Sequence, residues 1–436
     1  MKEQKQNLKK YILPAMLSNA SFFILTIVDG MFVGNGVGTD ALGAVSIAMP
    51  YVMIVGAISV LFSIGGVAVA AVRLGRGDAK GANQVFMHSF TAVMVVFGLM
   101  TILGTVCSDQ IALLLGANDT YKDMVSDYVF WYSVFAIPSA LYTCFASYCR
   151  NDGDPGLCSK TAIICVTTNI VADWVAVYPL GKGIAGAAFA TGFSSLVAIC
   201  VLMTHFLRKK GQLRFEKFRF NPSLLQKIIL RGLPEMVSQF AAPITTYSMN
   251  RMLLGYLGDA AVNAYSVIGY AGSLFASLMY GLAGGMQPLY GQSYGAKDEK
   301  SLKFYFRSGL TMAIVGGGLA FVLTFFIGGP LCQLFGADAA AYELVVSSLP
   351  KYCLNFVFAV NSAVLASYLF STKRTQYALA LNICRSLVCN FLCINFLPLM
   401  FGSNFIWYTV AVSEGMCLLI GLLLWKYSEK NGIAYK

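Results

Sequence analysis

Long apolar runs recur along almost the whole chain, from Tyr11 to Trp425, and they constrain the fold more than any other feature. Runs of about 18–25 residues are long enough to cross a hydrocarbon layer about 30 Å thick as helices. Only 12% of the residues are charged and the mean hydropathy is +0.68, which excludes an ordinary soluble domain. A membrane β-barrel would instead alternate over segments of about 10 residues. We therefore expect an all-α polytopic membrane protein.

The apolar pattern divides into twelve predicted transmembrane helices. They cover residues 11–34, 42–72, 86–108, 125–148, 158–180, 184–207, 232–256, 262–291, 305–330, 346–370, 376–400 and 404–426. Most of the 31 Lys and Arg residues fall on the tails and on alternate loops, all on one side. Because basic loops stay in the cytoplasm, both termini are predicted to be cytoplasmic, in a multi-pass protein of the cell (inner) membrane. The net charge of +11 thus sets the orientation, and we expect no nucleic-acid partner.

The sequence shows no evident cleavable signal peptide and no evident cofactor motif. The opening MKEQKQNLKK leads straight into the first apolar run, which favours a first span over a cleaved signal peptide. The 12 cysteines form no CxxC pair and are expected to pack within the helices. We expect no cofactor and no resident metal, apart from a coupling ion, H⁺ or Na⁺.

The chain contains an internal repeat. Leu13-Pro14 recurs as Leu233-Pro234, and we call this difference in numbering (234 − 14 = 220) the repeat offset. Other matches follow at the same offset without a gap: ALGAVS (41–46) with AVNAYS (261–266), GRGDAK (75–80) with GAKDEK (295–300), Gly116-Ala117 with Gly336-Ala337, and ASY (146–148) with ASY (366–368). A shared offset over this length indicates two copies of one unit.

Each copy holds six predicted spans, so both insert with the same orientation. This predicts two six-helix lobes in a parallel repeat, related by an axis along the membrane normal. The predicted divisions are an N-lobe at 1–207, a basic cytoplasmic linker at 208–231 and a C-lobe at 232–436. Two such lobes are the geometry of alternating access, in which they rock about a site between them.

Several segments resemble the MATE family, the multidrug and toxic compound extrusion transporters. They are Leu13-Pro14 with VDGMFVG (28–34) and ALGAV (41–45), CRNDGDP (149–155), NIVAD (169–173) and GIAGAAFAT (183–191). The likeness extends over essentially the whole chain, in order and spacing. It implies a twelve-helix secondary transporter that exports organic compounds.

Polar groups within the N-lobe spans predict a coupling site. Asp29 lies about 8 Å, and Asp173 and Thr191 each about 12 Å, from the outer end of their helices. Asn169 is four residues before Asp173, on the same helix face. Two carboxylates, an amide and a hydroxyl at one depth could hold a small cation or share a proton. The resemblance points the same way, because one branch of the family has an N-lobe cation or proton site at positions matching Asp29, Asn169, Asp173 and Thr191.

A plainer interpretation makes Asp29 a snorkelling side chain and Asp173 a hydrogen-bonding residue between helices. The repeat adds a contrast, because Asp29 corresponds to Met249 and Asp173 to Cys393. A second family branch carries acidic residues in its C-lobe, and their absence from the middle of spans 7 and 10 disfavours a sodium site there.

Two more charges lie deep in the C-lobe. Arg385 is about 13 Å into the eleventh span and Glu414 about 15 Å into the twelfth. Adjacent helices and similar depth predict an intramembrane ion pair. Its role, structural or gating, is left open by the residues.

The function that the sequence favours is H⁺- or Na⁺-driven antiport of amphipathic, cationic compounds by a monomer in the lipid bilayer. A flippase for lipid-linked oligosaccharides is the alternative, although the acidic N-lobe site disfavours a pyrophosphate ligand. An intramembrane enzyme is not expected, because neither a DDxxD-like cluster nor a membrane-boundary His/Asp pair is present. The absence of a Walker-type phosphate loop disfavours ATP-driven transport by this chain alone. A passive channel is a further alternative that the sequence does not decide.

Overall fold

The computed structural model describes residues 2–36, 39–117, 121–335 and 339–430, and these are helical almost throughout. The helices are α1 (Lys2–Gly36), α2 (Thr39–Gly75), α3 (Ala79–Val106), α4 (Ser108–Leu114), α5 (Lys122–Val134), α6 (Ala136–Asn151), α7 (Pro155–Val177), α8 (Gly183–Leu207), α9 (Pro222–Ser238), α10 (Ala241–Leu257), α11 (Asp259–Gly295), α12 (Glu299–Phe335), α13 (Ala339–Cys353), α14 (Asn355–Ser371), α15 (Thr375–Ile383), the π-helical turn η1 (Cys384–Cys389), α16 (Asn390–Phe401), the 3₁₀ turn η2 (Ser403–Tyr408) and α17 (Thr409–Lys430). The predicted all-α membrane fold is confirmed.

These helices supply the twelve predicted spans, several of them broken. Among the described residues, nine helices are long and apolar enough to cross a membrane, and α5 with α6 forms a tenth span bent by 49°. The seventh span is interrupted after Ser238, so that α9 and α10 are each only 17 residues long. The first span corresponds to α1, which contains Pro14. Breaks of this kind are tolerated in membrane helices because neighbouring groups satisfy the freed backbone.

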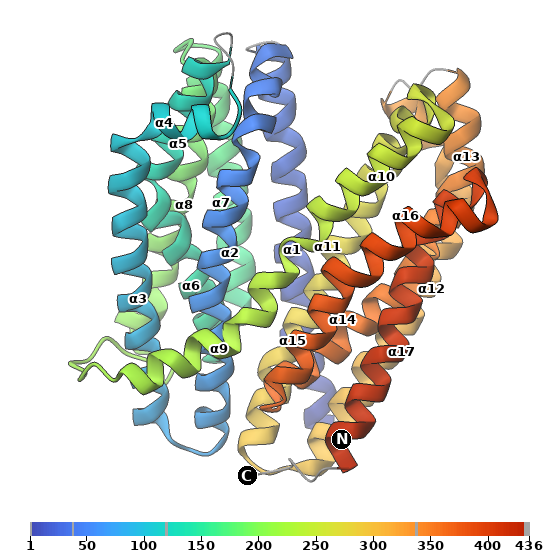
Figure 1. Cartoon of the computed structure of the whole chain (residues 1–436). Coiled ribbons are helices and arrows are strands. Elements are labelled where there is room, and N and C mark those ends of the chain that lie inside the picture. Colours follow the sequence, from blue (N-terminus) through green and yellow to red (C-terminus); the bar gives the residue numbers. More distant parts are fainter. Residues whose placement is uncertain (1, 37–38, 118–120, 336–338, 431–436) are drawn as a thin grey trace. The chain divides into compact units, whose positions relative to one another are not determined.

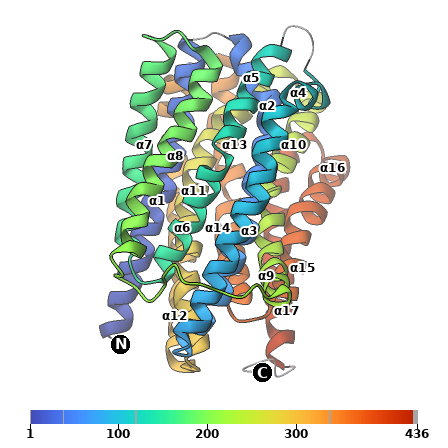
Figure 2. The same ribbon diagram turned by 90° about the vertical axis from the view of Figure 1, so that its left-hand side faces the viewer.

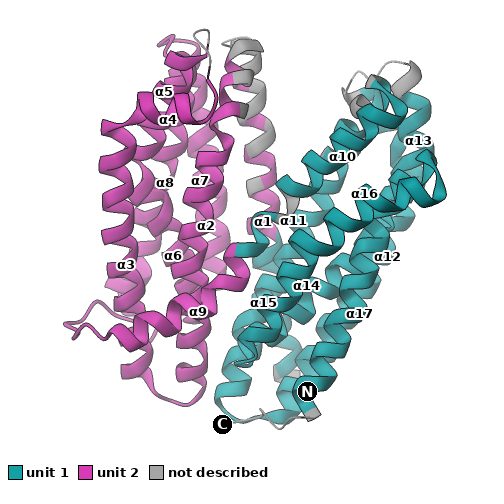
Figure 3. Ribbon diagram, viewed as in Figure 1, with its two compact units in different colours: residues 1–16, 237–436 teal, residues 17–236 magenta. Residues whose placement is uncertain are grey.

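The chain divides into two compact units, which Figure 3 colours separately. Unit 1 comprises residues 1–16 and 237–436, and unit 2 comprises residues 17–236. In unit 2, α2 packs on α3 and α6, α6 packs on α8, and α8 lies along α7 (Figures 1 and 2). In unit 1, α14 contacts α11, α12 and α17, and it is the most completely buried of these helices.

Each unit contains the opening segment of the other half of the sequence. Residues 1–16 open the first half but pack in unit 1, where the Gln4 amide donates to the Ser301 hydroxyl at 2.8 Å. Residues 222–236 open the second half but pack in unit 2. The unit boundaries, after Met16 and after Met236, are themselves separated by the repeat offset. The predicted lobe boundaries follow the order of the chain and did not anticipate this exchange.

Paired glycines make the exchange sterically feasible. A Cβ on Gly65 of α2 would meet the Ile228 carbonyl oxygen and would lie 2.8 Å from the Gly232 Cα of α9. Gly285 of α11, its repeat counterpart, lies in the same way against Ile12 of α1, with 2.9 Å to the Ile12 Cα. Ile12 and Gly232 are also repeat counterparts. Small residues that let helix backbones approach closely are the usual device for packing within membranes.

The basic segment between α8 and α9 is held against unit 2. The Asp152 carboxylate accepts from the Gln212 and Leu213 amides at 2.8 and 3.1 Å. The same carboxylate contacts His205 Nε2 at 3.0 Å. Leu213 is fully buried despite its charged neighbours. The linker is therefore an ordered part of this unit along its first residues.

Candidate functional site

Unit 2 places three of the four predicted coupling residues on two adjacent helices. Asn169 and Asp173 lie one turn apart on α7, and Thr191 lies on α8. These helices pack along each other through small residues of α8, including Gly186 against Ala176 of α7, and Figure 2 shows them side by side. The close packing brings polar groups of the two helices within hydrogen-bonding range.

The geometry joins Asn169 to Thr191. The Asn169 Nδ2 donates to the Thr191 hydroxyl at 3.3 Å, and that hydroxyl donates to the Ala187 carbonyl at 3.1 Å. Asn169 and Asp173 are both fully buried. Within the described part of the chain, the Asn169 Oδ1 has no hydrogen-bond partner. An acceptor oxygen is thus held in the interior on α7, one helical turn from the buried Asp173.

The fourth predicted residue, Asp29, belongs to α1, but its side chain lies outside the described residues. The complete site of Asp29, Asn169, Asp173 and Thr191 therefore stays a prediction. The residues that the structure describes include no group of three His, Cys, Asp or Glu side chains arranged to hold a metal ion. Any cation here would depend on amide and hydroxyl oxygens in addition to carboxylates.

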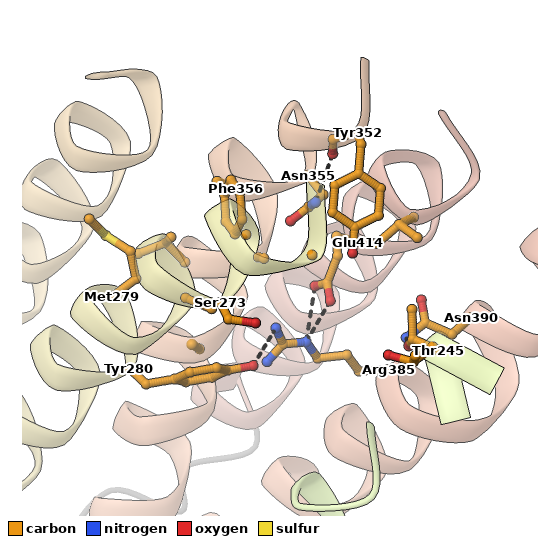
Figure 4. A pocket seen from close by; sticks show the side chains of 18 of the residues that line it. Thr245, Ser273, Met279, Tyr280, Tyr352, Asn355, Phe356, Arg385, Asn390 and Glu414 are labelled. Atoms are coloured by element: carbon orange, nitrogen blue, oxygen red, sulfur yellow. Dashed lines mark hydrogen bonds and ion pairs between the residues drawn. The ribbon is translucent and has the colours of Figure 1, made fainter. Parts of the chain in front are cut away.

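Unit 1 contains a cavity of about 400 Å³, which we call the unit 1 cavity. Its lining residues come from α10, α11, α13, α14, η1, α16 and α17, and Figure 4 shows many of them. Its wall combines aromatic rings with a few polar side chains. These include Thr245, Ser273, Tyr280, Tyr352, Asn355, Phe356, Arg385, Asn390 and Glu414. Apolar walls with a small number of placed polar groups are typical of small-molecule sites.

Arg385 and Glu414 form an ion pair in this cavity (Figure 4). The Arg385 Nε lies 2.8 Å from Glu414 Oε1 and 3.0 Å from Oε2. The Arg385 Nη2 donates to the Tyr280 hydroxyl at 3.3 Å. Both charged residues are more than nine-tenths buried. Arg385 lies within η1, a π-helical turn, and such turns occur frequently at functional sites.

A second group of hydrogen-bonded polar side chains lies along the cavity wall. Asn390 donates to the Thr245 hydroxyl at 2.9 Å and accepts from the Ser413 hydroxyl at 2.6 Å. Tyr265 and Tyr352 meet edge to face with ring centroids 5.6 Å apart. These contacts hold side chains of the cavity wall in place.

The spacing of charges in the sequence predicts the ion pair but not the cavity around it. Tyr280 was missed, since a single Tyr in an apolar helix carries no signal of its direction. The polar Asn390 and Thr245 were likewise not singled out as partners. Depth along a helix can be counted from sequence, whereas the face that a side chain occupies depends on packing.

Comparisons with known proteins give a consistent result. The MatE family model matches residues 14–175 and again residues 234–395. The two matched ranges are separated by the repeat offset, which agrees with the predicted repeat.

Two relatives cover most of the chain. The multidrug export protein MepA of Staphylococcus saprophyticus is 22% identical over 424 residues, which is 95% of this chain and 92% of that protein. An FAD transporter of Shewanella oneidensis is 24% identical over 387 residues, with 86% and 83% covered.

A crystal structure of a mutant of the Vibrio cholerae MATE transporter VcmN superposes with a TM-score of 0.93 at 18% identity. It covers 100% of this chain and 99% of that one. At this identity the likeness shows the fold.

Proposed function

We propose a function from one premise: the chain belongs to the MatE family, whose model matches both of its halves. We infer that this multi-pass membrane protein is a secondary active multidrug exporter. It antiports amphipathic organic compounds, cationic ones above all, against H⁺ or Na⁺. The name of the relative MepA, a multidrug export protein, supports the substrate class. The observation that carries the proposal is the buried polar cluster of α7 and α8.

In this proposal Asp173 carries the coupling ion. A carboxylate buried in a membrane span is costly as a bare anion, so occupancy by a proton or a cation stabilises it. The Asn169 Oδ1 and the Thr191 hydroxyl supply neutral oxygens nearby. Asp29 is the expected second carboxylate. Binding and release of the ion would change the net charge of the cluster and thereby bias the position of α1, which contains Pro14.

Export of a cationic compound requires either more than one coupling ion per transport cycle or a concentration gradient of that ion. One monovalent ion that enters across 100 mV releases about 2.3 kcal/mol. That energy sustains a gradient of about 50-fold for a neutral compound, at 1.36 kcal/mol per factor of ten. A monovalent cationic compound leaving against the same potential requires an equal amount. Exchange one for one is then electroneutral and is driven by the ion's concentration gradient alone.

The same proposal includes the setting of the protein. We place both termini in the cytoplasm and the chain in the cell membrane, acting as a monomer. Its partners are small amphipathic substrates and the lipid bilayer, with no nucleic acid and no cofactor besides the coupling ion. It has no enzymatic role.

The test is dye efflux from loaded cells or vesicles in which sodium and pH gradients are varied independently. Asp173→Asn and Asp29→Asn should each lower gradient-driven efflux at least about tenfold, because neither amide can bind and release a proton. Asp127→Asn, at an exposed aspartate of α5, is the matched control and should be neutral. Unchanged efflux and unchanged ion dependence in both variants, at equal expression, would overturn the proposal.

A further inference from the structure

The guanidinium group of Arg385 has donors beyond those that its ion pair uses. Arginine carries five N–H groups. In the described part of the chain, the Nε–H is shared by the two Glu414 oxygens, and one Nη2–H goes to the Tyr280 hydroxyl. Three N–H groups therefore have no acceptor among the described side chains. Figure 4 shows the guanidinium pointing toward the side of the cavity that holds Tyr280 and Ser273.

This arrangement differs from a saturated ion pair. Arginine and a carboxylate commonly meet through two parallel hydrogen bonds that use two nitrogens. Here one nitrogen serves both carboxylate oxygens, so the outer edge of the fork stays available to the cavity. A planar fork of two nitrogens is suited to a second carboxylate or phosphate. Glu414 meanwhile keeps the guanidinium in place and balances its charge.

The walls around this edge suit a flat ring system. Tyr280 is 48% exposed, and it faces the cavity beside Arg385 (Figure 4). Phe356 and Tyr352 also line the cavity, and Gly269 of α11 leaves open space beside it. A volume of about 400 Å³ falls within the range of small-molecule sites. Aromatic faces bind planar rings without selecting a particular substituent.

We propose that the unit 1 cavity binds planar aromatic compounds that carry a carboxylate, with the carboxylate on the free edge of Arg385 and the ring between Tyr280 and Phe356. The proposal rests on the proposed function in one respect, because it treats these compounds as cargo. It assigns to this cavity the recognition of aromatic acids and zwitterions among the exported compounds. In a zwitterion the cationic group would lie toward Glu414, which makes the pair complementary to both ends.

A purely structural ion pair is the competing explanation. Buried pairs contribute little net stability relative to well-packed apolar residues, so a structural role alone gives no reason for the unsatisfied donors. The two explanations differ in what a change of Glu414 does. If Arg385 binds an anion, removal of the competing carboxylate strengthens binding. If the pair only supports the fold, it does not.

The experiment measures binding to the full-length protein in lipid nanodiscs by isothermal titration calorimetry. The probes are three naphthalenes of equal ring size: 2-naphthoate, 2-naphthalenemethanol and 2-naphthylmethylammonium. We expect 2-naphthoate to bind at least about tenfold more tightly than the alcohol, since charge-assisted hydrogen bonds are about twice as strong as neutral ones. Equal affinities for the acid and the alcohol would overturn the proposal.

Variants separate the roles of the two charges. Arg385→Lys keeps a positive charge for Glu414 but lacks the fork, so the affinity for 2-naphthoate should fall about tenfold while the alcohol is unaffected. Glu414→Gln should raise the affinity for 2-naphthoate. Arg251→Lys, an exposed arginine on α10 that does not line the cavity, is the matched control and should change nothing. Unchanged 2-naphthoate binding in Arg385→Lys would overturn the proposal. It would also be overturned if the wild type bound the ammonium probe more tightly than 2-naphthoate and Glu414→Gln abolished the binding of the ammonium probe.

If a single variant fails to fold, Arg385→Gln with Glu414→Gln removes both charges together. The preference for 2-naphthoate over the alcohol should then disappear, and its persistence would contradict the role of Arg385. Asp173→Asn separates this inference from the proposed function. That variant should lose gradient-driven export but keep 2-naphthoate binding. If the protein exports a cationic dye but does not bind 2-naphthoate, only this inference is contradicted. If it binds 2-naphthoate but does not export the dye, only the proposed export function is contradicted.

Discussion

The two units carry different chemistry at equivalent positions of the repeat. Cys165 and Ser194 of unit 2 are the repeat counterparts of Arg385 and Glu414 of unit 1. Both pairs are in contact, the first through a weak hydrogen bond at 3.6 Å between Sγ and Oγ and the second through an ion pair at 2.8 Å. The repeat therefore preserves a helix–helix contact while its chemical content changes from neutral to ionic.

One helical turn away, the more polar pair of residues belongs to unit 2. Asn169 and Thr191 are hydrogen-bonded in unit 2, whereas the corresponding Cys389 and Ala411 of unit 1 are small and weakly polar. Unit 2 thus has a neutral hydrogen bond at both positions, whereas unit 1 has an ion pair at one position and small residues at the other. One fold presents a buried carboxyl group with neutral oxygens in one unit and a charge-balanced pair beside a cavity in the other. This contrast suits a division between ion coupling and cargo binding.

The largest expected effect is on stability and concerns the ion pair of unit 1. Glu414→Ala leaves the buried Arg385 without its counter-charge and should lower the free energy of unfolding by about 3–5 kcal/mol. Ser194→Ala, at the equivalent position of unit 2, removes only neutral hydrogen bonds and should cost about 1 kcal/mol. Thermal unfolding followed by size-exclusion chromatography compares the two. Equal losses in both variants would mean that the pair is not energetically distinct.

An intermediate effect is expected where unit 2 carries the amide. Asn169→Ala removes one oxygen of the proposed coupling site and the hydrogen bond to Thr191, and should weaken the apparent affinity for the coupling ion about tenfold, which is about 1.4 kcal/mol. Cys389→Ala, at the equivalent position of unit 1, should leave ion dependence unchanged. The measurement is efflux rate against sodium concentration and against pH. A shift in Cys389→Ala as large as in Asn169→Ala would remove the asymmetry between the units.

The smallest effect concerns a feature that both units share. Asp78 accepts from the Gly81 amide at the start of α3, and Asp298, its repeat counterpart, accepts from the Ser301 amide at the start of α12. Hydrogen bonds from the Ser301 hydroxyl and amide lower the pKa of Asp298, which lies outside the membrane spans. Asp298→Ala should cost about 1 kcal/mol, as loss of a helix cap does.

The sign of the pH dependence follows from that lowered pKa. The stabilisation by Asp298 is fully present above the ordinary aspartate pKa of about 3.9 and is lost as the pH falls through the lower folded-state value. The difference in melting temperature between wild type and Asp298→Ala should therefore be constant near neutral pH and shrink in strong acid. A difference that grows in acid would contradict the cap.

Sequence determined the class of fold and the location of the charged residues along it. The length of the apolar runs requires membrane helices, because each run is long enough to cross the hydrocarbon layer as a helix, which satisfies its backbone hydrogen bonds within one segment. The repeat offset identified two copies, and the family match has the same offset. Counting depth along the helices placed Arg385 and Glu414 at one level, and the structure has them in contact.

Tertiary structure alone decided which faces meet. In a membrane, lipid and protein interior are both apolar, so hydrophobic periodicity does not tell a buried face from a lipid-facing one. Neither the exchange of residues 1–16 and 222–236 between the units nor the approach of Tyr280 to Arg385 could be derived from spacing. Both depend on close packing between helices far apart in the chain, at glycines such as Gly65 and Gly285 whose role is visible only beside their partners.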